Sequence, residues 1–301
     1  MIKKVFYLQN LNYKTQKLLI LFGFLTIPVL LLATFNLYPA TRLLVYSFTD
    51  WDGLSHHFNW VGFDNYKDVF SDKETFAALS HNLYYFVGAI VQNILALYFA
   101  VILNTKIRGR NIFRLVLFAP YILNGVAISF MFLFFFKTDG GTLNSLLHWI
   151  GLSNWEQSWL GNPKLINISL SFVSLWRYMG LGMVIYLGVL QSISADLYEA
   201  AKIDGANAMQ SFRYITLPSI RKVIELNMLL AVAGALEVFD IPFVMTGAAS
   251  GSDTFVTRVV DIAFKFQSFG LASAMSVALI VIVVIVIAIQ RKLILGRGER
   301  D

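Results

Sequence analysis

The sequence contains no cysteine and carries little charge, and both absences narrow the classes of protein open to it. Without cysteine, disulfide frameworks, thiolate chemistry and cysteine metal sites are excluded. Only 14% of the 301 residues are Asp, Glu, Lys or Arg, whereas soluble domains carry about 25%. With 57% hydrophobic residues, this deficit is explained if much of the surface faces hydrocarbon. No stretch of the chain reads as a separate soluble domain.

Reactive side chains are scarce as well. The sequence has only four histidines: His56, His57, His81 and His148. The adjacent pair lacks further spaced ligands, so we expect a solvated loop there and no metal site. No Gly-x-x-x-x-Gly-Lys phosphate loop occurs in the sequence. We therefore expect a non-enzymatic chain that binds no cofactor of its own.

What the sequence does have is long apolar runs. Crossing the core of a bilayer takes about 20 mostly apolar residues, and backbone groups in lipid must bond within their own helix. The first run is too long for a signal-peptide core and lacks a clear cleavage site, so it is expected to stay in the protein. Six spans are predicted: Leu18–Tyr46, Leu83–Asn104, Leu115–Phe136, Ile168–Ile193, Leu226–Thr246 and Phe269–Gln290.

Basic residues give these spans a direction, because cytoplasmic loops are enriched in Lys and Arg. With the N-terminus inside, sixteen basic residues fall on the inner side: Lys3, Lys4, Lys14, Lys17, Lys106, Arg108, Arg110, Arg114, Lys202, Arg213, Arg221, Lys222, Arg291, Lys292, Arg297 and Arg300. Six fall outside: Lys67, Lys73, Lys137, Lys164, Arg258 and Lys265. The net charge of +6 thus indicates topology and no nucleic-acid partner. We expect cytoplasmic segments at 1–17 and 295–301, flanking a six-helix domain at 18–294.

The polar segment 194–221 joins the fourth and fifth spans on the predicted inner side. Ser194 is a suitable N-cap, and Asp196 follows in the first turn, where the helix dipole favours an acid. Gly205 can end this helix in the left-handed conformation. Asn207 can cap a second short helix, and Pro218 suits the first turn of the helix leading into the fifth span. From the residues alone, the segment is either a solvated connector or a docking surface for a soluble partner.

A motif in this segment decides between these two interpretations. Glu199-Ala200-Ala201, then Gly205 and, nine residues later, Ile215-Thr216-Leu217-Pro218 resemble the EAA signature of permease subunits in binding-protein-dependent ABC importers. The chain resembles most the first permease subunit of carbohydrate importers, as in maltose and glycerol-3-phosphate systems. Further similar stretches are Ser47-Phe48-Thr49-Asp50-Trp51, Val61-Gly62-Phe63-Asp64-Asn65-Tyr66, Phe113-Arg114 with Ala119-Pro120, Leu197-Tyr198, Asp204-Gly205-Ala206 and Phe239-Asp240.

The resemblance implies an all-α type I importer permease fold in the cytoplasmic membrane. It implies a homologous second permease as heterodimer partner, two ATPase subunits that bind ATP and Mg, and an extracytoplasmic solute-binding protein. The coupling helix would dock on an ATPase subunit through Glu199, Ala200, Ala201, Asp204 and Gly205. The family often has Thr-x-Gly-Gly-Pro after the fifth span. Here the sequence reads Thr246-Gly247-Ala248-Ala249-Ser250, which leaves the conformation of that outer loop open.

Charged residues inside spans are costly and are candidates for function. Glu237 and Asp240 are three apart and are expected on one helix face. Arg177 either pairs with one of them or lines a passage, where it would suit the carboxylate or phosphate of an acidic sugar. By resemblance to the maltose permease, Arg177, Tyr178 and Leu181, with Ala235, Val238 and Asp240, match solute-contact positions, and with Glu237 they form the predicted pathway.

Two other features have more than one interpretation. The outer loops at 50–81 and 137–166 contain five tryptophans, which form either an aromatic belt at the membrane interface or a docking surface for the binding protein. Gly270, Ala274 and Ala278 form a stripe for close helix packing. The main functional alternative to an importer is a secondary transporter or channel that needs no ATPase.

Overall fold

The computed structural model describes residues 12–105, 107–249 and 251–295, and across them the chain is helical. Apart from a single antiparallel bridge between Thr49 and Trp60, these residues contain no β-structure. The all-α fold class is confirmed. Residues 1–11 and 296–301, which make up most of the two predicted terminal segments, lie outside the described residues, as do Lys106 and Ser250.

Five helical segments are long and apolar enough to cross a membrane, and a bent helix pair would make a sixth. The five are α2 (Tyr13–Leu32) with η2 (Ala33–Leu37) and α3 (Tyr38–Tyr46), α5 (Lys73–Asn104), α9 (Ile166–Leu190), α13 (Arg221–Leu236) with α14 (Asp240–Thr246), and α16 (Phe269–Leu295). Shorter elements connect them: α4 (Asp64–Ser71), α8 (Thr142–Trp149), η3 (Ser153–Trp155), α10 (Ala195–Ile203), α11 (Ala208–Ser211), η4 (Phe212–Thr216), α12 (Leu217–Ser219), α15 (Phe255–Val260) and η5 (Asp261–Lys265).

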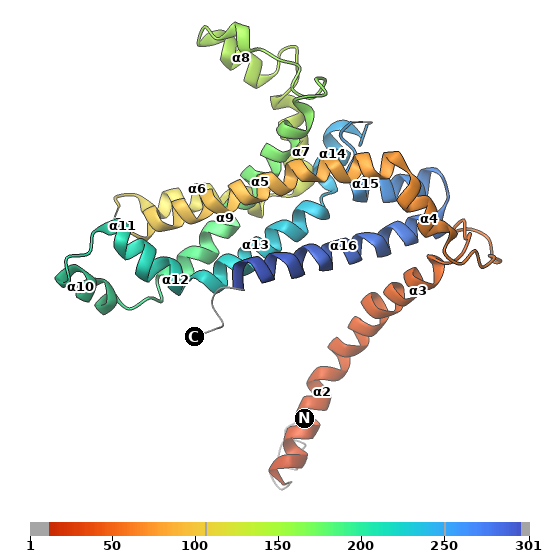
Figure 1. Ribbon diagram of the computed structural model, residues 1–301, viewed down its shortest axis with the longest axis horizontal. Coiled ribbons are helices and arrows are strands. Elements are labelled where there is room, and N and C mark those ends of the chain that lie inside the picture. The colour runs from red at the N-terminus through yellow and green to blue at the C-terminus, as the bar shows by residue number, and fades with distance from the viewer. Residues whose placement is uncertain (1–11, 106, 250, 296–301) are drawn as a thin grey trace, which may run out of the picture.

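The third predicted span is wrong as a single helix. It divides into α6 (Arg110–Ile122) and α7 (Gly125–Phe135), which meet at an angle of 101°. Leu123 is extended, and the Asn124 side chain caps α7 by accepting from the amides of its first turn at 2.9 and 3.4 Å. A capping side chain stabilises a new helix start, so α7 leads away from the bundle toward α8 (Figure 1).

The fifth predicted span is also interrupted, between Glu237 and Asp240. Glu237 is the C-cap of α13, Phe239 has φ −134° and ψ −57°, and Asp240 begins α14. The prediction that Glu237 and Asp240 share one helix face is therefore wrong, because they belong to different helices. Pro242 supplies part of the reason, since it has no amide to donate to the carbonyl four residues earlier.

Side chains from other elements satisfy the carbonyls released at this interruption. Asn82 of α5 donates its amide to the carbonyls of Ala235 and Leu236 at 2.8 and 3.2 Å. The Thr254 hydroxyl donates to the Val238 carbonyl at 2.8 Å. Buried backbone groups need such partners, so other elements of the fold stabilise this break. We refer to residues 237–239 as the fifth-span break.

Helices α5, α6, α9, α13 and α16 run alongside one another, with α10–α12 at one end of the bundle and α4 and α15 at the other (Figure 1). The predicted small-residue stripe packs within the chain, since Ala274 and Ala278 are buried against the elements around α16. The Gly270 amide donates to the Trp51 carbonyl at 2.9 Å. The structural interpretation of this stripe is confirmed.

The first span is an exception to this packing. Helix α2 diverges from the bundle (Figure 1), and none of the most apolar window of Tyr13–Tyr46 is buried. Its second half, α3, packs against α16 of the bundle. Mean hydropathy in that window is 2.6, which fits a helix surrounded by lipid or by another membrane chain.

Candidate translocation cavity and coupling loop

A cavity of about 600 Å³ lies among α5, α9, α13 and the fifth-span break. Six of the seven residues predicted for the pathway line it: Tyr178, Leu181, Ala235, Glu237, Val238 and Asp240. Helix α9 presents two of them, and the others come from the end of α13, the break and the start of α14. Because α13 ends at the break, Glu237 lies exposed in the lining.

The lining also contains polar side chains that the sequence prediction missed. Gln92, Asn93, Ser174 and Asn227 contribute amides and a hydroxyl, and Tyr121 adds a phenol. Two of them are engaged, since Asn93 accepts from Tyr186 at 3.0 Å and Asn227 donates to the Gly182 carbonyl at 3.3 Å. Within the described part of the chain, Gln92 and Ser174 have no such partner. Their presence inside strongly apolar runs was the available clue.

Arg177 is the one predicted pathway residue outside the lining. Its guanidinium Nη1 lies 2.5 Å from Oδ2 of Asp240, and its side chain is only 13% exposed, against 32% for Asp240. The guanidinium also lies over the Tyr178 ring, 4.9 Å from the centroid, which is a favourable cation–π arrangement. The ion-pair alternative for Arg177 is thus confirmed, with Asp240 and not Glu237 as the partner.

This ion pair lies against the start of α7. A Cβ atom at Gly125 would clash with both the Asp240 carboxylate and the Arg177 guanidinium, so a larger residue there would displace the ends of these two side chains. The pair therefore joins α9, α14 and α7 at one point. Because the charge of Arg177 is already neutralised, the observation that favoured an acidic sugar no longer supports one.

The polar segment after α9 folds as predicted. Ser194 accepts from the Asp196 amide at 3.3 Å and starts α10, and Gly205 ends it with φ +81°. Asn207 and Gln210 form a reciprocal capping box at the start of α11. Pro218 lies in the short α12 and not in the first turn of α13, which starts at Arg221. We call residues 194–221, the segment predicted to contact an ATPase, the coupling loop.

The coupling loop leaves its motif residues open to a partner. Glu199, Ala200, Asp204 and Gly205 are exposed and Ala201 is half-buried. Large apolar side chains beside them are exposed as well: Ile203 at 86%, Met209 at 72% and Tyr214 at 70%. Apolar side chains gathered on one loop mark an interaction site more often than a solvated connector. On its inner face, the Tyr198 hydroxyl lies 2.9 Å from that of Thr216 and holds the loop together.

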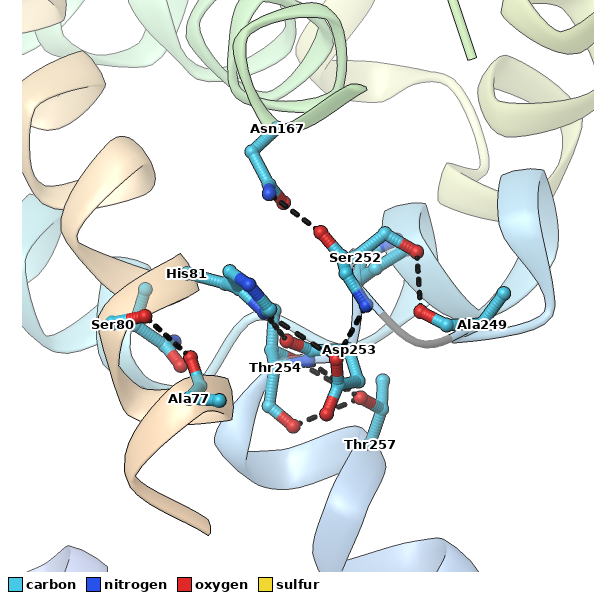
Figure 2. Close-up of polar contacts among 12 residues, drawn as sticks. Ala77, Ser80, His81, Asn167, Ala249, Ser252, Asp253, Thr254 and Thr257 are labelled. Atoms are coloured by element: carbon cyan, nitrogen blue, oxygen red, sulfur yellow. Dashed lines mark hydrogen bonds and ion pairs between the residues drawn. The ribbon is translucent and has the colours of Figure 1, made fainter. Parts of the chain in front are cut away.

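At the other end, the loop after α14 is held by polar contacts from α5 and α9 (Figure 2). Asn167 donates to the Gly251 carbonyl at 2.7 Å, and His81 Nδ1 lies 2.8 Å from the Asp253 carbonyl oxygen. In addition, Asn82 accepts from the Phe255 amide at 3.0 Å. Asn82 therefore supports both the fifth-span break and the loop after α14.

Acidic residues near α4, at the end of the bundle opposite the coupling loop, are stabilised as carboxylates. Hydrogen bonds from the Ser55 hydroxyl and from the amides of Ser55 and Leu54 lower the pKa of Asp52 to about 2. Asp72 caps α5 by accepting from Glu74 and Thr75 at 3.1 Å. Burial opposes the charge of Asp72, but the hydrogen bonds and Arg258 outweigh it and lower its pKa.

Comparisons with known proteins agree with this geometry. The family described as "Binding-protein-dependent transport system inner membrane component" matches residues 92–295. The multiple sugar-binding transport system permease protein MsmF of Streptococcus mutans is 34% identical, across 90% of this chain and 93% of that protein. The trehalose/maltose transport system permease protein MalF of Thermococcus litoralis is 32% identical, across 80% and 81%.

A solved structure extends the likeness to the fold. The crystal structure of a bacterial ABC transporter that imports the acidic polysaccharide alginate superposes with a TM-score of 0.81, covering 95% of this chain and 98% of that one. Their sequence identity is 19%, so this likeness concerns the fold. The resemblance inferred from the EAA motif is confirmed at the level of the family. The chain belongs to the inner membrane components of binding-protein-dependent transport systems, the permease subunits of ABC importers.

Proposed function

We propose that this chain forms half of the translocation pathway of an ATP-driven carbohydrate importer. The observation that supports this most is one covalent connection. Helices α9 and α13, which line the cavity, are joined directly by the exposed coupling loop. A soluble motor that grips Glu199–Gly205 would move both walls of the cavity at once. Such rigid-body motion around a fixed site is how transporters alternate access.

Carbohydrate is the proposed solute class for two reasons. The lining combines amides, hydroxyls and tyrosine rings, which suit the hydroxyl groups and apolar faces of sugars. Relatives that share most of the chain carry names of sugar transport permeases. The rest of the importer would comprise a homologous permease, two ATPase subunits with ATP and Mg, and an extracytoplasmic binding protein.

Co-purification with the ATPase subunits tests the coupling role. Glu199→Lys reverses the charge of an exposed motif residue, and we expect the complex to be lost. At Gly205, φ is +81° and a Cβ atom would meet nothing within 4 Å. Only the backbone conformation therefore limits which residue fits there. Gly205→Asn should retain the complex and Gly205→Val should lose it, because Asn tolerates the left-handed region and β-branched residues do not. Asp68→Asn, exposed on α4 at the opposite end, is the control.

Reconstituted uptake separates this proposal from a secondary transporter or channel. Proteoliposomes that contain the full complex, with ATP inside and the binding protein outside, should accumulate labelled solute, and vanadate should abolish the accumulation. Gradient-driven, vanadate-insensitive uptake by this chain alone would contradict the proposal.

A further inference from the structure

The charges in the cavity lining are all of one sign. Among the described residues that line it, Glu237 and Asp240 are the only charged ones, and none is Lys, Arg or His. Asp240 is neutralised by Arg177 behind it. Glu237 forms no ion pair or side-chain hydrogen bond within the described residues, and it is exposed. The formal charge of the lining therefore includes one carboxylate that no basic side chain in the lining balances.

The position of Glu237 strengthens the electric field of its carboxylate inside the cavity. Glu237 follows the last residue of α13, where the helix has already ended, and its amide still bonds the Ala233 carbonyl at 3.0 Å. The C-terminal end of a helix carries partial negative charge, which adds to that of the carboxylate. The surrounding low-dielectric walls concentrate such a field inside a cleft. A negatively charged solute entering the cavity would therefore meet repulsion, and a neutral one would not.

We infer that Glu237 is a specificity-determining residue that keeps acidic sugars out of the cavity and admits neutral ones. The inference rests on the proposed function, because it names the class of sugar carried by the same site. A preference for neutral sugars would distinguish this chain from the alginate importer that shares its fold and whose solute is acidic. It also reverses the expectation drawn from Arg177 alone.

Charged thiol reagents test the field in the cavity without transport, ATP or sugar. The chain has no cysteine, so a single introduced cysteine reports its own surroundings. Gly234→Cys is the near reporter, since it lines the cavity one helical turn before Glu237 and a Cβ atom there meets nothing within 4 Å. Ser174→Cys, on α9, is the second reporter. Labelling is read from the mass of this chain in the assembled complex.

The measured quantity is a ratio of two labelling rates. The rate with an anionic sulfonatoethyl methanethiosulfonate is divided by the rate with a cationic trimethylammonioethyl methanethiosulfonate. Each ratio is normalised to that of an exposed Ser192→Cys reporter, which lies between α9 and the coupling loop. For charges several ångströms apart, removing one changes such a ratio on the order of five-fold. We expect Glu237→Gln to raise the ratio by that amount at Gly234→Cys, and Glu237→Lys to raise it further. The change should shrink as salt is added.

Asp68→Asn, which removes a carboxylate outside the cavity, should leave both ratios unchanged. Asp240→Asn should raise them, because it uncovers the positive charge of Arg177. Ratios that stay within two-fold of the parent at both reporters in Glu237→Gln would overturn the inference, even for a complex that imports sugar normally. A complex that fails to import sugar but shows the expected ratios would contradict the proposed function and leave the charge filter standing.

Discussion

At the scale of single residues, Ala248 is one of two non-glycine residues with positive φ in the described part of the chain. It has φ +51°, a left-handed conformation that costs a non-glycine residue about 1–2 kcal/mol. It follows Gly247, the C-cap of α14, which has φ +62°. The departure from the family pattern noted in the sequence is located here, because Ala248 stands where related proteins often have glycine. In this chain an alanine therefore bears the cost of the left-handed conformation.

Replacing Ala248 with glycine should therefore stabilise the protein. The relief of strain exceeds the extra chain entropy of glycine, so we expect a gain of about 0.5–1 kcal/mol, measured as a higher midpoint of thermal unfolding in detergent. Ala249→Gly is the matched control, because Ala249 lies outside the positive-φ region and should be destabilised slightly or unchanged. A lower midpoint for Ala248→Gly would contradict this account.

The ion pair between Arg177 and Asp240 predicts a strongly non-additive double variant. Removing one partner of a buried pair leaves an uncompensated charge and costs about 3–5 kcal/mol. Asp240 is partly exposed, so we expect about 2 kcal/mol for Arg177→Met or Asp240→Asn alone. The double variant should unfold closer to the parent than either single variant does. Additive losses in this double-mutant cycle would show that the two charges do not interact.

Asp52 predicts an acid transition of the outer loop. Its folded-state pKa of about 2 lies below the ordinary 3.8, so its contribution is complete above pH 4 and is lost as the pH falls toward 2. Trp51 reports on the same turn, since its indole donates to the Ser55 carbonyl at 2.9 Å. The fluorescence difference between the parent and Trp51→Phe should change over this window, and Asp52→Asn should abolish the transition.

At the scale of elements, the two broken spans show where prediction from sequence ends. The apolar length of a run predicts that a segment is helical and membrane-sized, and the described parts of all six predicted runs are largely helical. Hydropathy reveals neither the break at Asn124, which a local cap stabilises, nor the fifth-span break, which also needs partners elsewhere in the chain. The fifth-span break depends on Asn82 and Thr254, which are 153 and 16 residues from their acceptors. The coupling loop was predicted well because its caps are local.

Asn82 should accordingly be among the most sensitive positions. It is 1% exposed and serves two carbonyls and one amide. Asn82→Leu keeps the size but leaves those groups unpaired, for which we expect a loss of about 3 kcal/mol. Ser80→Ala, two residues away, removes a hydroxyl that bonds only within its own helix and should change stability by less than about 0.5 kcal/mol. Equal effects of the two variants in thermal unfolding would contradict the role given to Asn82.

At the scale of the whole molecule, the described basic residues are unevenly divided between the two ends of the bundle. The elements at the coupling-loop end (Figure 1) are α10–α12 with the starts of α6 and α13. They contain Arg110, Lys202, Arg213 and Lys222, and Arg108 directly precedes α6. The other end, with α4 and α15, carries acidic Asp50, Asp52, Asp64, Asp68 and Asp72 on its loops and caps. This distribution favours the orientation expected from the sequence, with the coupling loop in the cytoplasm.

Site-directed labelling checks that orientation. Ser192→Cys and His57→Cys are exposed positions at opposite ends, and the cysteine-free background makes each label specific. In right-side-out membrane vesicles, an impermeant maleimide should react with His57→Cys only. In inside-out vesicles it should react with Ser192→Cys only. The reverse pattern would place the coupling loop outside the cell and remove its access to an ATPase.

Helix α2 also bears on the lifetime of the protein in the cell. Among the described residues nothing buries its apolar window, so if the proposed second permease covers α2, the surroundings of this helix depend by mass action on how much of that chain is present. Copies synthesised in excess of that chain keep α2 in contact with lipid alone. Quality-control proteases that survey the bilayer for unassembled helices would find their substrate there, and the supply of the partner would set the abundance of this subunit.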